Sequence, residues 1–88
     1  MSKSVFTGDY EGFRLLLIEA RNSAGLTQID LARKLGRPQS FVSKYERGER
    51  RLDVIEFLEV AHAIGIDPSH FIRKLQQAAI AKRRTRPS

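Results

Sequence analysis

Residues 27–48, with the sequence TQIDLARKLGRPQSFVSKYERG, carry a dense set of helix start and stop signals. Thr27 is a preferred N-cap residue, and Asp30 three residues later can complete a reciprocal capping box. Gly36 can adopt the left-handed conformation that ends a helix. Pro38 has a fixed φ and lacks a backbone donor, which suits the first turn of a helix. The stretch therefore predicts two short helices joined by a tight turn, the second beginning at Pro38.

Helical patterning continues on both sides of this stretch. Upstream, apolar side chains recur at helical spacing between Asp9, which can cap a helix, and Gly25, which can end it. Downstream, Asp53 and the pair Asp67 with Pro68 provide start signals for two more helices. Neither strand-like alternation nor an internal repeat occurs in the sequence. We therefore expect an all-α fold, a compact five-helix domain with a helix-turn-helix at its second and third helices.

The length of 88 residues leaves room for one core. A chain of this size buries only about 60–65% of its extended surface on folding. Because the sequence contains no cysteine, packing must stabilise the fold without disulfides or thiolate metal sites. The predicted core residues are Phe13, Leu16, Leu17, Ala20, Ala24, Leu31, Ala32, Leu35, Val42, Tyr45, Val54, Phe57, Leu58, Ala61 and Ile64.

The two ends of the chain differ from this body in composition. Residues 1–8 lack periodicity and are predicted to form a flexible N-terminal arm. Residues 82–88, KRRTRPS, contain no apolar side chain to bury, so we expect a basic, disordered tail. The folded helix-turn-helix domain is thus expected to span residues 9–81.

Positive charge is concentrated in the middle of the chain and near its end. The formal net charge is +6, yet residues 33–51 carry +5 and residues 82–86 carry +4, which leaves −3 for the remainder. A purely solubilising role for the lysines and arginines would explain the total but not the clustering. The distribution favours a polyanionic partner over an acidic protein or a membrane surface.

Residue patterns for catalysis or metal binding are missing from the sequence. His62 and His70 lie on different predicted helices, without a carboxylate or a second His at ligand spacing. No nucleophile has a neighbouring base, and no Gly-rich loop could bind phosphates. The longest apolar run, Leu15–Ile18, is too short to span a membrane, and the first ten residues lack a signal core. We therefore expect a cytoplasmic protein that is not an enzyme and uses no metal, cofactor or small-molecule ligand.

Four motifs occur in a fixed order along the chain: Gly25-Leu26-Thr27-Gln28, Leu35-Gly36, Gln39-Ser40 and Glu46-Arg47-Gly48. This ordered set resembles the Cro/C1-type, or xenobiotic-response-element, helix-turn-helix family of the lambdoid phage repressors and Cro. The resemblance covers roughly residues 13–75 and implies a prokaryotic DNA-binding regulator whose third helix enters the major groove. Relatives often have Ser or Thr where this chain has Pro38, so the cap of the third helix must come from backbone geometry at Arg37 or be missing.

The expected base contacts lie on one exposed face of the third helix. Glutamine can pair bidentately with adenine, and lysine can reach the acceptors of guanine. Phe41 is open to two interpretations, because it could pack on a thymine methyl group or form the edge of the core. The residues predicted to touch bases are Gln39, Ser40, Phe41, Ser43 and Lys44.

Phosphate contacts are expected on either side of that face. Gln28 matches the family position that binds a phosphate near a helix N-terminus. Solvation explains any single surface arginine, but several around one helix favour phosphate binding. The predicted phosphate contacts are Thr27, Gln28, Arg37, Arg47, Arg50 and Arg51. The resemblance also implies a partly buried salt bridge between Arg21 and Glu46 that orients the third helix.

One recognition helix covers too few bases to define a genomic site. We therefore expect a homodimer on a palindromic operator in double-stranded DNA, with half-sites about 34 Å apart. Ile72, Leu75 and Ile80 on the fifth helix are the candidates for the dimer interface. Such a protein would act as a repressor or autoregulator. The alternatives are an antitoxin-type module that mainly masks a protein partner and binds DNA secondarily, and a nonspecific nucleic-acid binder that depends on the basic tail.

Overall fold

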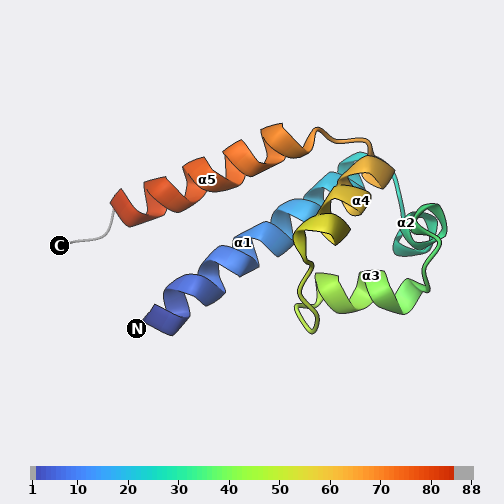
Figure 1. Cartoon of the computed structure of the whole chain (residues 1–88), viewed down its shortest axis with the longest axis horizontal. Coiled ribbons are helices and arrows are strands. Elements are labelled where there is room, and N and C mark those ends of the chain that lie inside the picture. Colours follow the sequence, from blue (N-terminus) through green and yellow to red (C-terminus); the bar gives the residue numbers. More distant parts are fainter. Residues whose placement is uncertain (1, 85–88) are drawn as a thin grey trace.

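The computed structural model describes the backbone of residues 2–84 and the side chains of residues 9–78. Within this part of the chain the secondary structure is entirely helical, as predicted. Figure 1 shows the long α1 and α5 extending together from a body that contains the shorter α2, α3 and α4. The helices are α1 (Ser2–Ser23), α2 (Gln28–Leu35), α3 (Gln39–Glu46), α4 (Val54–Ile64) and α5 (Pro68–Arg84).

The start signals of α2 and α4 act as predicted. Asp30 N donates to Thr27 Oγ1 at 3.0 Å, and Thr27 N donates to Asp30 Oδ2 at 3.0 Å. Asp53 and Glu56 form the same reciprocal capping box at α4. Gly36 ends α2 with a φ of 67°, the left-handed conformation that glycine adopts without a Cβ clash. Local residue spacing therefore fixes both ends of α2.

The outer ends of α1 and α5 differ from the prediction. The first helix begins at Ser2, so Asp9 lies inside it instead of capping it, and the predicted arm of residues 1–8 is helical from its second residue. The last helix continues to Arg84, within the predicted tail of residues 82–88. Residues 85–88 lie outside the described part of the chain. Extending an existing helix gains one hydrogen bond for each residue that is fixed, so extension needs no amphipathic pattern.

Pro38 is the N-cap of α3 and not its first helical residue. Its φ of −64° is the value fixed by the ring, but its ψ of 154° is extended. No side chain caps α3. Of the two outcomes anticipated for this position, the structure shows a missing side-chain cap.

The core lies between α1 and the four later helices. Tyr45, Leu17, Leu31, Val42 and Val60 are completely buried. Phe13 of α1, Phe57 of α4 and Phe71 of α5 form an aromatic cluster with ring centroids 5.2–5.8 Å apart. Aromatic pairs at these distances add to the stability gained from burial, so the cluster joins the long helices to α4.

The buried face of α4 matches the prediction in part, because Phe57, Ala61 and Ile64 are buried as expected. Val54 is 72% exposed and Leu58 is 43% exposed, while Val60, absent from the predicted core, is fully buried. Ala24 of the predicted core is also exposed. Both sets of α4 residues satisfy helical spacing, and contact with α2 and α5 selects the face that is buried. As a result, the apolar side chains of Val54 and Leu58 lie on the solvent face of α4.

Candidate nucleic-acid interface

Helix α3 buries one face and presents polar residues on the other. Gln39, Ser40 and Lys44 are exposed, and Ser43 is half-buried. The Ser43 hydroxyl donates to the Ser40 carbonyl oxygen at 3.3 Å, a local bond within the helix. Four of the five predicted base contacts therefore share one accessible surface. The buried residues of α3 are Phe41, Val42, Tyr45 and Glu46.

A buried ion pair joins the C-terminal end of α3 to α1. Glu46 is 5% exposed, and its carboxylate accepts from Arg21 Nε at 2.7 Å and from Arg21 Nη2 at 3.0 Å. This hydrogen bonding is the main cause of the raised pKa of Arg21. Arg21 Nη1 also donates to the Leu26 carbonyl oxygen at 2.8 Å, just before α2. The salt bridge implied by the family resemblance is therefore present, in the bidentate geometry that is strong for arginine and carboxylate.

Gln28 extends this network to the N-terminal end of α3. Its Nε2 donates to Glu46 Oε1 at 2.9 Å, and its Oε1 accepts from Gln39 Nε2 at 3.2 Å. Both ends of the Gln28 amide are thus hydrogen-bonded inside the protein. This structural role was not predicted from the sequence. The resulting series Arg21, Glu46, Gln28 and Gln39 connects α1, α2 and α3, and we call it the orienting network.

Phe41 belongs to the core edge. Its side chain is 9% exposed, and its ring packs edge-to-face on Tyr45 at 5.7 Å between centroids. The guanidinium carbons of Arg37 and Arg50 lie 4.5 and 4.8 Å from the Phe41 centroid. Because these groups enclose the ring, the structure supports the core interpretation and not the predicted contact with a thymine methyl group.

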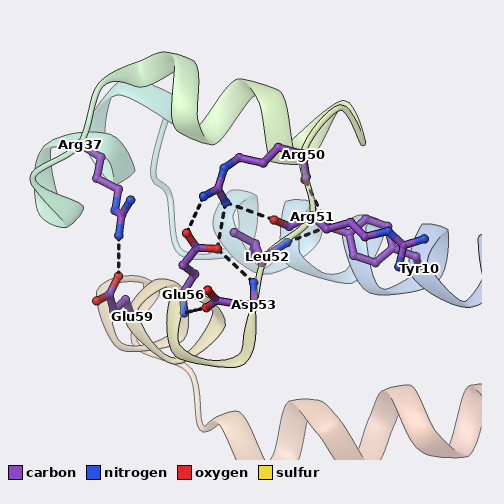
Figure 2. Close-up of polar contacts among 8 residues, drawn as sticks. All are labelled: Tyr10, Arg37, Arg50, Arg51, Leu52, Asp53, Glu56 and Glu59. Atoms are coloured by element: carbon purple, nitrogen blue, oxygen red, sulfur yellow. Dashed lines mark hydrogen bonds and ion pairs between the residues drawn. The ribbon is translucent and has the colours of Figure 1, made fainter.

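Three of the predicted phosphate-binding arginines have carboxylate partners within the chain. The pairs formed by Arg37 and Arg50 both reach α4 (Figure 2). The third pair lies within the loop that follows α3. A DNA phosphate would have to compete with these carboxylates for the guanidinium groups. The pairs are Arg37 Nη2 with Glu59 Oε1 at 3.2 Å, Arg47 Nε with Glu49 Oε2 at 2.8 Å, and Arg50 Nη2 with Glu56 Oε2 at 2.6 Å.

These pairs shift the titration of their carboxylates. Hydrogen bonds from the Arg50 side chain, and then from the Asp53 backbone, lower the pKa of Glu56 to about 2. The hydrogen bond from Arg47 lowers the pKa of Glu49 below its ordinary value. Because each charged form is stabilised by its donors, both carboxylates stay ionised at lower pH than an ordinary glutamate.

Tyr10 of α1 fixes the loop that follows α3. Its hydroxyl donates to the Arg50 carbonyl oxygen at 3.3 Å and accepts from Leu52 N at 3.2 Å (Figure 2). The guanidinium carbon of Arg51 lies 4.4 Å from the centroid of the Tyr10 ring. Tyr10 was not among the residues predicted from the sequence, although its position one turn before Phe13 was a usable signal.

An apolar surface lies on α4 and α5. Ile72, a predicted dimer contact, is exposed, and Leu75 is half-buried. The side chain of Ile80 lies outside the described residues. Three neighbouring apolar side chains on α4 are exposed as well, and a groove of about 400 Å³ runs past Val54, Ile72 and Leu75. The exposed α4 residues are Val54, Ile55 and Leu58.

The described residues provide neither a metal-binding cluster nor a membrane-spanning helix. Among the described side chains no group of three or more His, Cys, Asp or Glu residues could hold a metal ion. His62 and His70 are exposed. The described helices include none with the length and hydropathy of a bilayer-spanning segment.

Known proteins share this arrangement of helices. Residues 17–71 match a protein family described as helix-turn-helix. The chain is also 51% identical to the solved structure of an XRE-family like protein from Pseudomonas syringae pv. tomato str. DC3000. That match covers 88% of this chain and 94% of the other, with a TM-score of 0.84. The chain belongs to the XRE, or Cro/C1-type, helix-turn-helix family.

More distant solved structures show the same fold. The wild-type restriction-modification controller protein C.Esp1396I is 23% identical, with a TM-score of 0.74 over 84% of this chain and 95% of that one. A point variant of the same controller protein is 22% identical, with a TM-score of 0.73 over 82% and 91% of the two chains. A search among curated proteins gives no significant match. Membership of the XRE family makes this chain a DNA-binding helix-turn-helix protein of the transcription-regulator class, with α2 and α3 as the motif.

Proposed function

We propose that this XRE-family chain is a sequence-specific regulator that binds a palindromic operator as a homodimer, with α3 in the major groove. The observation that carries the proposal is the orienting network, because it ends on an exposed side chain of α3. Gln28 holds the Gln39 amide through a 3.2 Å hydrogen bond. A restrained amide loses less freedom when it pairs with adenine, which favours recognition.

The proposed base contacts are the accessible polar residues of α3. Gln39 and Ser40 lie in the first turn, the part of a recognition helix that enters the groove most deeply. Lys44 is exposed, and its long stem can extend to the acceptors of guanine. Ser43 lies between them on the same face. These four residues are the ones whose substitution should change base preference.

The proposed phosphate contacts surround this face. Thr27 and Gln28 stand at the N-terminus of α2, where backbone N–H groups favour an anion. Arg47 and Arg51 are exposed near the end of α3, and Arg37 lies before its start. Because Arg37 and Arg47 are already paired with carboxylates, phosphate binding would replace one anion with another. Each should therefore contribute less affinity than an unpaired arginine.

Dimerisation is proposed to use α5 and the adjoining face of α4. Ile72, Leu75 and Ile80 remain the proposed contacts on α5. The exposed apolar residues of α4 extend this surface beyond what the sequence predicted, and apolar patches of this kind commonly mark protein interfaces. Two copies bound to one operator would exclude other proteins from a promoter, which is the basis of the proposed repressor or autoregulatory role. Its cytoplasmic, prokaryotic location stays a prediction.

An antitoxin-type role is the second candidate, favoured by the same apolar face of α4. That face could bind a different protein in place of a second copy. The two roles differ in what the purified chain does by itself. A dimer that selects DNA without any partner supports the regulator, whereas a chain that stays monomeric and binds DNA only weakly supports the antitoxin.

The proposal is tested by selecting binding sites for the full chain from a pool of random duplexes. We expect enrichment of one palindromic motif, and a complex on that motif that contains two chains by sedimentation. Enrichment of no motif would contradict sequence-specific recognition. Enrichment of a single, non-repeated half-site would contradict the dimer.

A further inference from the structure

We propose that Arg50 is a positioning residue for base recognition, which together with Phe41 and Glu56 sets the orientation of α3 on α4. We call these three residues the Arg50 clamp. The inference rests on the proposed sequence-specific DNA binding, and it replaces the phosphate contact expected for Arg50 from its charge and location.

The guanidinium group of Arg50 is bonded on both of its terminal nitrogens. Nη1 donates to Glu56 Oε1 at 2.9 Å, and Nη2 donates to Glu56 Oε2 at 2.6 Å (Figure 2). Nη1 also donates to the Arg51 carbonyl oxygen at 3.1 Å. The bidentate fork is the strongest geometry between arginine and carboxylate. A phosphate could reach this group only by breaking these hydrogen bonds to Glu56 and to the Arg51 carbonyl oxygen.

The same guanidinium lies over a buried ring of the recognition helix. Its carbon is 4.8 Å from the centroid of Phe41, within the range of a cation–π contact. Phe41 belongs to α3 and Glu56 to α4, so Arg50 joins the two helices from the loop between them. Arg37, paired with Glu59 at 3.2 Å, makes a similar contact with the ring at 4.5 Å. That second connection has one long bond and a more exposed carboxylate, so we expect it to restrain α3 less.

Glu56 is itself held in place by the start of α4. Its Oε1 accepts from Asp53 N at 3.0 Å, and its backbone N donates to Asp53 Oδ1 at 2.7 Å. The side chain is only 13% exposed, compared with 39% for Arg50. The clamp is therefore anchored to a capped helix end, and rigid support of this kind preserves the geometry of a binding face.

The clamp completes the restraint of a short helix. The orienting network fixes α3 to α1 through Glu46 and to α2 through Gln28. The Arg50 clamp adds α4 as the third support. Loss of this support should let the exposed face rotate, which would weaken base discrimination before it weakens phosphate binding.

Arg51 provides a matched control. It follows Arg50 in sequence, carries the same charge and is exposed beside the Tyr10 ring. It joins the loop to α1 and makes no contact with the Phe41 ring among the aromatic contacts of the described residues. Arg51 is thus the better phosphate candidate, and replacing either arginine removes one positive charge from the same loop.

The experiment compares the wild type with Arg50→Gln, Glu56→Gln and Arg51→Gln in the full chain. The probes are a duplex with the motif selected by the wild type and a duplex with one recognition base changed. We expect Arg50→Gln and Glu56→Gln each to lose about tenfold in discrimination between the two, the effect of one misaligned base contact. Arg50→Gln should leave the salt dependence of binding unchanged, while Arg51→Gln should reduce its slope by about one and keep discrimination.

Glu56→Gln separates positioning from a phosphate role most sharply. A glutamine can still accept from Asp53 N, so the capping box is retained and the variant should fold. If Arg50 binds phosphate, releasing it from Glu56 should tighten binding and leave discrimination intact, and that result would overturn the clamp. A reduced salt slope for Arg50→Gln with full discrimination would do the same. If the wild type selects no motif, the proposed function and the clamp both fail. If the wild type selects a motif and the variants discriminate as well as it does, only the clamp fails.

Discussion

The α2–α3 face and the α4–α5 face of this chain differ in whether their side chains find partners within the chain. At the first, the carboxylate of Glu46 receives three hydrogen bonds, from Arg21 and Gln28, all within the chain. At the second, Val54, Ile55 and Ile72 leave large apolar surfaces in solvent. The DNA-recognition unit is thus complete within one chain, while the other face offers surface that a second copy can cover. The contrast predicts which substitutions impair folding and which impair assembly.

The largest expected effect follows from breaking the orienting network. Glu46→Ala removes the carboxylate and leaves the largely buried Arg21 without its partner. Loss of one member of a buried ion pair costs about 3–5 kcal/mol, so the free energy of unfolding should fall by this amount in urea titration. Glu49→Ala, which removes an exposed carboxylate that also pairs with an arginine, is the control and should change the free energy of unfolding far less, because solvent screens exposed pairs. Equal, small losses in the two variants would show that the network is not structural.

The second effect concerns assembly on the other face. The double variant Ile55→Glu and Ile72→Glu places two charges on the apolar surface, where desolvation and repulsion oppose a two-fold contact. We expect monomers by sedimentation and a loss of about 100-fold or more in affinity for the palindrome, because the second half-site no longer binds in concert. The control is Leu15→Glu. Leu15 is an exposed apolar residue of α1 that does not line the groove beside Val54 and Ile72, so its substitution should leave the dimer and its affinity unchanged. A dimeric double variant would place the interface elsewhere.

A smaller effect should appear in the pH dependence of stability. The pKa of Glu56 is lowered from its ordinary 4.5 to about 2 in the folded chain. The contribution of the ionised Glu56 to the free energy of unfolding is therefore fully present above about pH 5. It is lost as pH falls toward 2, where the folded state also binds the proton. The difference in unfolding free energy between wild type and Glu56→Gln should shrink over this window. A difference that stays constant from pH 7 to pH 2 would contradict the pairing of Glu56 with Arg50.

The smallest predicted effect is a gain of affinity. Glu49→Gln releases Arg47 from its carboxylate and removes a negative charge close to the proposed DNA surface. An exposed pair is held only weakly, because solvent screens it, so binding to the selected motif should tighten by about two- to fivefold with base preference unchanged. Fluorescence anisotropy at several salt concentrations measures this change. Weaker binding by the variant would mean that Glu49 does not compete with phosphate.

Much of the fold was predictable because the relevant signals are local. The capping boxes of Thr27 with Asp30 and of Asp53 with Glu56 depend on residues three positions apart, and both form. The buried face of α4 was not predictable in this way. Val54 and Val60 both fit a helical stripe, and only the packing of distant helices decides between them.

The candidate site was predictable in part for a similar reason. The exposed polar face of α3 follows from helical geometry, and the ion pair of Arg21 with Glu46 was expected from the family resemblance. The carboxylate partners of the arginines were missed. The pair of Arg37 with Glu59 spans 22 residues of sequence and depends on tertiary placement, whereas the partners of Arg47 and Arg50 are two and six residues away. A signal was nevertheless present, since Asp53, Glu56 and Glu59 recur at three-residue spacing along α4. That acidic stripe supplies two of the three partners.

The central claim is that the exposed face of α3 recognises bases, with Gln39 held by the orienting network. The most direct test is to repeat the random-duplex selection with Gln39→Ala beside the wild type. We predict that the variant keeps the palindrome but loses its preference at one position of each half-site, equivalent to about 1–3 kcal/mol of discrimination. Recovery of an unchanged motif, with the same preference at every position, would contradict the account.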